Sequence, residues 1–261
     1  MRFKAPIPIV ILGVPIPGSE NPFLASPIAS ITVDIDIWEC KNPSANIVGS
    51  KDLESALTDF WLKLTRGLGL KLCSTLSLYN VEGVMRPPLG GLYASLTSLT
   101  LYAVHRFHGD LAQALDIVET ASLIDLVDVD VSWRLVLEAL RYSTLRGKPL
   151  AYRGPLEVYV FENTEPAKVN VGAHVEGVKS VLSRDSLGYN VYGALIHLIG
   201  EAVLEASSRI RDGMKLIDVI TIFKPIHDGV TLTVYNLKPS SDNCLWSPGT
   251  PWAFDEVCLV V

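Results

Sequence analysis

The stretch Pro87-Pro88-Leu89-Gly90-Gly91-Leu92-Tyr93-Ala94-Ser95-Leu96-Thr97-Ser98 joins a glycine turn directly to an uncharged, helix-patterned segment that continues to His105. Two glycines after two prolines allow close backbone approach, and the helix that follows directs unpaired N–H groups and the positive end of its dipole at the turn. This combination predicts an anion site. The alternative is a tight connection whose helix packs in the core. The stretch has neither the Gly-Lys-Ser/Thr of a Walker loop nor the Gly-x-Gly-x-x-Gly of a dinucleotide fingerprint.

The run from Pro88 to Thr97 resembles the second motif of the GHMP kinases, the superfamily of galactokinase, homoserine kinase, mevalonate kinase and phosphomevalonate kinase, usually written P-x-G-x-G-L-G-S-S-A. The glycine turn is one residue shorter here, and Tyr93 and Ala94 stand where Gly and Ser are expected. Two further stretches match in order and spacing. Residues 5–13 resemble the opening motif A-P-G-[KR]-[VI]-x-L-x-G-E-H, and residues 21–34 resemble the loop and second strand that follow it.

The departures from the family pattern fall on residues that carry chemistry. Pro8 replaces the basic residue of the opening motif and Ile7 the glycine before it, while Val14-Pro15 replaces the Glu-His pair. Proline cannot hold a phosphate oxygen as a lysine does. The third family motif, a glycine-rich turn, is reduced to Ser247-Pro248-Gly249-Thr250-Pro251.

The resemblance implies an α+β fold of the GHMP-kinase type with two lobes. Residues 1–150 would form an N-terminal lobe with a mixed sheet, helices and the glycine turn, and residues 151–261 a C-terminal lobe of ferredoxin-like character. The implied activity is ATP- and Mg²⁺-dependent phosphoryl transfer to a small hydroxyl or phosphate substrate, with isoprenoid intermediates such as mevalonate as the first expectation. One alternative is a catalytically inactive relative that keeps the fold for ligand binding or for subunit assembly. For either function, a homodimer is left open. Another alternative is an unrelated α+β domain.

The resemblance also implies site residues. The backbone N–H groups of the glycine turn would cradle the phosphates of ATP, and Ser95 would help to hold Mg²⁺ and take part in catalysis. The cradle residues are Gly90, Gly91, Leu92, Tyr93, Ala94 and Ser95. In phosphoryl transfer, positioning and cationic groups carry most of the catalysis. Arg86 and Arg134 could therefore act as clamps, or they could be ordinary surface arginines.

In the family, an aspartate on the helix after the second motif is the base or charge partner of the substrate hydroxyl. Asp130 matches that place, with Asp128 as the second choice. An aspartate just before a helical run is also what an N-cap requires, so capping is the alternative role of Asp130.

Composition restricts the class of protein without choosing among these functions. The chain has 261 residues, of which 49% are hydrophobic and 19% charged, and its net charge of −6 argues against a general nucleic-acid binder. No segment reads as a signal peptide or a membrane span, which predicts a cytoplasmic protein. Cys40, Cys73, Cys244 and Cys258 have no regular spacing, and buried free thiols are the favoured interpretation.

Hydrophobic periodicity predicts most of the secondary structure. The strands are expected at 7–12, 28–39, 70–79, 156–161, 219–223, 230–237 and 257–261, and the helices at 52–68, 93–107, 111–127, 131–146 and between 174 and 211. Alternation puts Asp34 and Asp36 on one strand face, where a solvated surface is favoured over a metal site. His105 and His108 are read as complementing a helix C-terminus rather than as a metal pair. His174, His197 and His227 are read as isolated.

Overall fold

The computed structural model describes all residues except 49–50, 81–86, 110–112, 126–128, 183–188 and 261. Its strands are β1 (Arg2–Leu12), β2 (Phe23–Glu39), β3 (Ser44–Val48), β4 (Leu72–Asn80), β5 (Leu150–Gly154), β6 (Glu157–Val160), β7 (Val169–Val175), β8 (Cys244–Pro248) and β9 (Phe254–Leu259). Its helices are α1 (Lys51–Gly67), α2 (Leu89–Phe107), α3 (Ala114–Ile124), α4 (Val131–Arg146), α5 (Tyr189–Arg211) and α6 (Leu216–Tyr235). The mixed α+β class predicted from the sequence is confirmed.

The larger sheet has six strands in the order β3-β4-β2-β5-β6, with β1 also paired to β2. Of the strand pairs that the described residues form in this sheet, β3–β4 is parallel and the others are antiparallel. Along β2 the residues between Ile31 and Ile37 alternate between buried apolar and more exposed polar side chains. One face of this part of the sheet therefore packs in the core, and the other meets solvent.

Asp34 and Asp36 lie on the outer face of β2, as the alternation predicts. Asp36 is exposed, whereas the Asp34 side chain is only 12% exposed and accepts a hydrogen bond from the Arg2 guanidinium at 2.9 Å. The solvated-face interpretation is confirmed for Asp36 and is wrong for Asp34, which is mostly buried.

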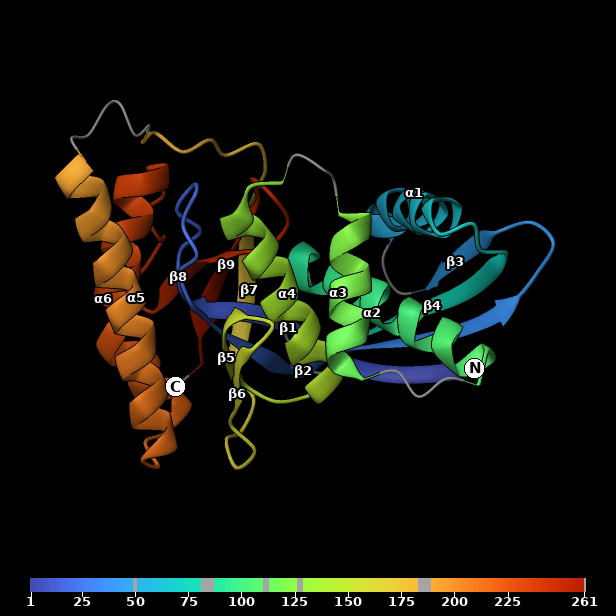
Figure 1. Cartoon of the computed structure of the whole chain (residues 1–261), viewed down its shortest axis with the longest axis horizontal. Coiled ribbons are helices and arrows are strands. Elements are labelled where there is room, and N and C mark those ends of the chain that lie inside the picture. Colours follow the sequence, from blue (N-terminus) through green and yellow to red (C-terminus); the bar gives the residue numbers. More distant parts are fainter. Residues whose placement is uncertain (49–50, 81–86, 110–112, 126–128, 183–188, 261) are drawn as a thin grey trace.

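Helices cover the inner face of this sheet. Leu53, Leu57 and Trp61 of α1 and Leu92 and Leu96 of α2 are buried in one apolar cluster with the inward side chains of β1 and β2. The spacing of four residues places these side chains on one stripe of each helix. Figure 1 shows α2, α3 and α4 side by side in front of the sheet, with α1 at the end that carries β3 and β4.

The smaller sheet has the order β7-β9-β8 and lies near α5 and α6, which pack against each other at the other end of the molecule (Figure 1). The strands predicted at 219–223 and 230–237 are wrong, because both segments belong to helix α6. Its buried residues Val219, Phe223, Val230 and Val234 recur at helical spacing, and Pro225 is accommodated inside the helix. The β-branched residues suggested strands, but tertiary packing outweighs that weak preference.

The expectation of free thiols is also wrong. Cys40 pairs with Cys73, and Cys244 pairs with Cys258, which lies directly opposite it in the β8–β9 ladder. Sequence spacing gave no signal for either bond, because each joins positions that only the sheet register brings together.

The boundary between the two predicted domains, at residue 150, falls at the start of β5. Strands β5 and β6 pair into the larger sheet, whereas β7 begins the smaller one. The division into residues 1–150 and 151–261 stays a prediction.

Candidate functional site

Helix α2 begins at Leu89, four residues before the predicted start, so the two glycines lie in its first turn. A Cβ atom on Gly90 would be 2.2 Å from the Cα of Gly249, and one on Gly91 would be 1.9 Å from the carbonyl oxygen of Pro8. Both glycines are therefore needed for close backbone contact. The N-terminus of α2 is packed between β1 and the turn after β8, which brings parts of all three predicted motifs together.

This helix N-terminus has no cap. The N-cap residue is Pro88, no side chain accepts from the first N–H groups, and the first turn contains no acidic residue. The first backbone donor with a partner is Leu92, which donates to Pro88 at 3.0 Å. Within the described part of the chain, the N–H groups of Leu89, Gly90 and Gly91 have no acceptor, although all three residues are buried. Buried donors without acceptors are costly, and an anion would supply the acceptors.

Ser95 lies one turn deeper in α2 and is fully buried. Its Oγ is 3.1 Å from the Oγ1 of Thr144 on α4, so this hydroxyl joins the two helices. Tyr93 and Ala94 stand beside it in the helix, where their N–H groups follow the helical hydrogen-bond pattern. A hydroxyl with no exposed surface and a protein partner does not fit the role of a Mg²⁺ ligand, so we assign no step to the metal.

Asp130 is the N-cap of α4, the alternative that the sequence left open. Its Oδ1 accepts from the N–H of Ser132 at 2.9 Å and from the Ser132 hydroxyl at 2.5 Å. Its Oδ2 accepts from the N–H of Gly18 at 2.8 Å. The carboxylate thus fixes both the start of α4 and the loop that follows β1.

Of the three other predicted residues, Arg134 alone lies in the described part of the chain. Arg134 is half exposed and lies 3.8 Å from Glu138. Arg86 and Asp128 lie outside the described residues. Among the described residues, no group of three or more His, Cys, Asp or Glu side chains could hold a metal ion.

His174 is not isolated, contrary to the sequence interpretation. Its Nδ1 is 2.7 Å from Oδ1 of Asp255, and its Nε2 is 2.9 Å from Oε1 of Glu176. Asp255 is buried, and its Oδ2 is 3.5 Å from the place that a Cβ on Gly249 would take. The His174–Asp255 pair therefore lies beside the Gly249 turn, which packs against the first turn of α2. The two residues are 81 positions apart, so no sequence pattern could have revealed it.

A second polar group missed by the sequence analysis links α3, α4 and β5. Arg141 and Asp125 form a bidentate ion pair at 2.7 and 2.6 Å, with the arginine side chain 4% exposed. Glu138 accepts from the Tyr152 hydroxyl at 2.6 Å. Burial and this hydrogen bond raise the pKa of Tyr152 above its usual range. The group fixes the helices rather than facing the α2 N-terminus.

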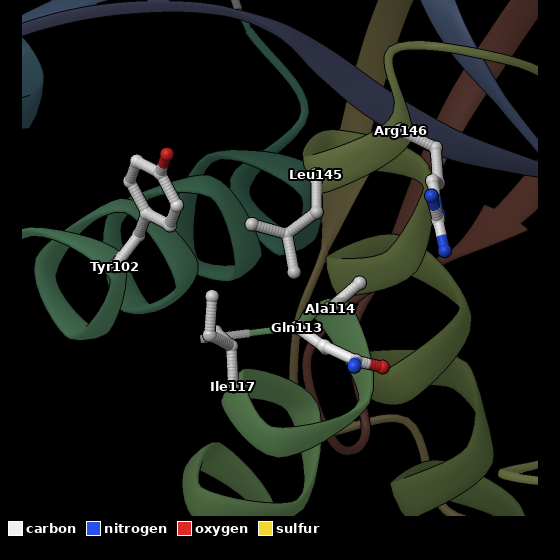
Figure 2. A pocket seen from close by; sticks show the side chains of 6 residues that line it. All are labelled: Tyr102, Gln113, Ala114, Ile117, Leu145 and Arg146. Carbon is white, nitrogen blue, oxygen red and sulfur yellow. The ribbon is translucent and has the colours of Figure 1, made fainter. Parts of the chain in front are cut away.

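A cavity of about 380 Å³ lies between α2, α3 and α4 (Figure 2). Its walls are Tyr102, Ile117 and Leu145, with Arg146 and Gln113 toward one side. It is lined by the C-terminal halves of α2 and α4, so it is separate from the uncapped N-terminus of α2.

Comparisons with known proteins now bear on this arrangement. No model of a protein family matches the sequence, and no curated protein matches it. Solved structures do match over the full chain. Phosphomevalonate kinase of Streptococcus pneumoniae, in complex with phosphomevalonate and AMPPNP, is 12% identical and covers 100% of this chain and 93% of its own, with a TM-score of 0.57.

Two further solved structures also match nearly the whole chain. Mevalonate kinase of Methanococcus jannaschii is 13% identical and covers 100% of this chain and 90% of its own, with a TM-score of 0.57. Mevalonate pyrophosphate decarboxylase of Streptococcus pyogenes is 10% identical and covers 99% of this chain and 89% of its own, with a TM-score of 0.54. The chain has the fold of these kinases and of this decarboxylase, the GHMP-kinase fold, at 10–13% sequence identity.

Proposed function

We propose that this protein binds the phosphates of ATP at the N-terminus of α2 and transfers a phosphoryl group to a small hydroxyl or phosphate substrate. The observation that carries this proposal is the uncapped first turn of α2, in which the N–H groups of three buried residues have no acceptor in the described structure. The first turn of α2 holds no acidic side chain, and the Asp255 carboxylate beside the Gly249 turn is hydrogen-bonded to His174.

The shared fold supports the choice of ligand. One of the similar structures is a kinase complex with AMPPNP and phosphomevalonate. Small acceptors such as mevalonate and phosphomevalonate are therefore the first substrates to test. ATP would supply the transferable phosphoryl group. In this chain, Leu89, Gly90 and Gly91 would hold its phosphate oxygens through their N–H groups. Asp130 is the proposed partner of the acceptor hydroxyl, and to act it would have to release part of its present hydrogen bonding.

Binding without phosphoryl transfer is the second candidate function, and three observations favour it. Pro8 stands in place of the family's basic residue. The Ser95 hydroxyl is occupied by Thr144, and both oxygens of Asp130 are occupied by Ser132 and Gly18. A protein that senses or stores a phosphorylated ligand would need the α2 N-terminus and none of the catalytic groups.

The binding proposal is tested by giving α2 a cap of its own. Pro88 has the extended backbone of an N-cap (φ −64°, ψ 122°), so the carboxylate of Pro88→Asp can accept from the free N–H groups. We expect this variant to be at least as stable as the wild type and to bind ATP at least tenfold more weakly. The matched control, Pro88→Ala, offers no acceptor and should retain affinity. Binding is read as the rise in melting temperature with ATP or AMPPNP, which corresponds to about 2.7 kcal/mol at 100 times the dissociation constant.

Equal nucleotide affinity in wild-type protein and Pro88→Asp would contradict a phosphate site at this helix. Transfer is tested separately, by measuring ATP turnover across small alcohols and phosphates, including mevalonate and phosphomevalonate. Nucleotide binding with no turnover above the rate without enzyme would favour the second function. Where turnover is found, Asp130→Asn should lower it about 100-fold or more on general-base grounds. It should cost about 1 kcal/mol in stability, because the amide keeps only one acceptor oxygen.

A further inference from the structure

A second hollow lies at the far end of α2, with a volume of about 640 Å³. It forms where the end of β2, the connection from α1 to β4 and the last turn of α2 meet. Helix α2 has 19 residues and a rise of about 1.5 Å per residue, so its two ends are about 28 Å apart. In Figure 1 the helix runs from the centre of the molecule toward the end that carries β3 and β4. The hollow is therefore distinct from the proposed phosphate site.

The inner wall of the hollow is apolar. It is made by Leu70, Leu72, Val104 and Phe107, of which Leu72 is buried and the other three are half-buried. These side chains come from the α1–β4 connection, β4 and α2. A concave apolar wall of this size is typical of sites for small organic molecules, which usually occupy about 300–1,000 Å³.

The rim carries excess positive charge. Lys41 and Lys71 both line it, and neither forms an ion pair with any described residue. Glu39 is the acidic group of the rim. Two ammonium groups against one carboxylate leave this rim positive on a chain whose net charge is −6. The carbonyl end of α2 opposes an anion only weakly, because a helix terminus carries about half a charge and the N–H of His108 already binds the carbonyl of Val104.

The rim is held in place by a covalent bond. The Cys40–Cys73 disulfide ties the turn that carries Lys41 to β4, and the N–H of Cys40 donates to the carbonyl of Lys71 at 2.9 Å. The two lysine backbones are therefore fixed close to one another. A ligand that contacts both ammonium groups would therefore have to order only the two lysine side chains and not the backbone that carries them.

We infer that this hollow is a binding site for an amphipathic organic anion, whose carboxylate, sulfonate or phosphate would meet Lys41 and Lys71 and whose apolar part would lie against Leu72 and Phe107. The inference does not depend on nucleotide binding at the other end of α2. Ligand at this site would contact the helix whose first turn forms the proposed phosphate site.

The test uses 8-anilinonaphthalene-1-sulfonate, a fluorescent aromatic sulfonate, titrated against the whole folded protein. We expect saturable binding that octanoate displaces and 1-octanol does not, and that excess AMPPNP leaves unchanged. The double variant Lys41→Met, Lys71→Met keeps the apolar stems and removes the charge, and should bind at least tenfold more weakly. Its matched control is Lys63→Met, Lys238→Met, which removes the same charge from exposed positions outside the hollow.

A cavity-filling variant tests the apolar wall independently. Val104→Trp places a large side chain in the hollow and should abolish the saturable, octanoate-displaceable binding of the dye while leaving both lysines in place. The inference is overturned if the Lys41→Met, Lys71→Met protein binds the dye within threefold of wild type, or if AMPPNP displaces the dye. It is also overturned if the folded wild-type protein shows no saturable binding. Melting curves of each variant show that it is folded under the assay conditions.

Discussion

Replacing Gly90 by alanine should destabilise the protein, although alanine is the better helix former. The added Cβ would lie 2.2 Å from the Cα and 2.5 Å from the carbonyl carbon of Gly249. These are backbone atoms of the turn after β8, so they cannot move aside as a flexible side chain can. Overpacking of this kind costs about 1–3 kcal/mol, and contact with backbone favours the upper end. The gain in helix propensity, at most about 1 kcal/mol, offsets part of it.

We therefore expect Gly90→Ala to lose about 2 kcal/mol of unfolding free energy, which lowers the melting temperature by roughly 4–8 °C in a chain of this size. The matched control is Gly193→Ala on α5, where an added Cβ meets nothing within 4 Å. That variant should be unchanged or up to about 1 kcal/mol more stable.

Urea denaturation and thermal melts of both variants measure the difference. The contact also carries a functional expectation, because moving α2 away from Gly249 changes the position of the free N–H groups. Gly90→Ala should therefore weaken ATP binding, whereas Gly193→Ala should not. A Gly90→Ala protein as stable as Gly193→Ala would refute the close approach of α2 to the Gly249 turn.

Three other predictions concern the stability of the fold. Asp125→Ala leaves the buried Arg141 guanidinium without its partner and should cost about 3–5 kcal/mol in urea denaturation, whereas Glu157→Gln, at an exposed pair, should change stability by less than about 0.5 kcal/mol. Burial lowers the pKa of His227, so the folded state binds fewer protons than the unfolded state, and the free energy of unfolding should fall as the pH drops below about 6.5. His227→Gln should flatten this loss of stability. An unchanged pH profile in that variant would contradict the role of His227. The Cys40–Cys73 bond joins residues 33 positions apart, so its reduction should lower the free energy of unfolding by roughly 3–4 kcal/mol. Equal stability of the oxidised and reduced proteins would show that the bond does not constrain the unfolded chain.

Local sequence was sufficient to predict the elements whose hydrophobic pattern is strong. The alternation after Ile31 predicts both the strand and the outer face that carries Asp34 and Asp36, because a strand has only two faces and the core takes one of them. It does not predict that Asp34, beside Arg2, is mostly buried on that face. The N-cap alternative for Asp130 is likewise a local property, since a capping carboxylate reaches an N–H only two residues away.

Local sequence was misleading where tertiary contacts decide. In α6 the β-branched residues favour strands, but the burial of Val219, Phe223, Val230 and Val234 along one side stabilises a helix instead. The disulfides and the His174–Asp255 pair join residues 14 to 81 positions apart, and only the sheet register makes them neighbours.

The sequence alone determined that this chain has an α+β fold with a glycine-rich helix start resembling that of the GHMP kinases, because glycine pairs and hydrophobic periods are properties of short segments. Only the tertiary structure decided what those glycines do. They let α2 touch Pro8 and Gly249, which come from distant parts of the chain. Among the described residues, the N–H groups of this first turn have no acceptor. The sequence shows that a position holds glycine, which has no side chain. Which backbone segment packs against that glycine is decided only when the chain folds.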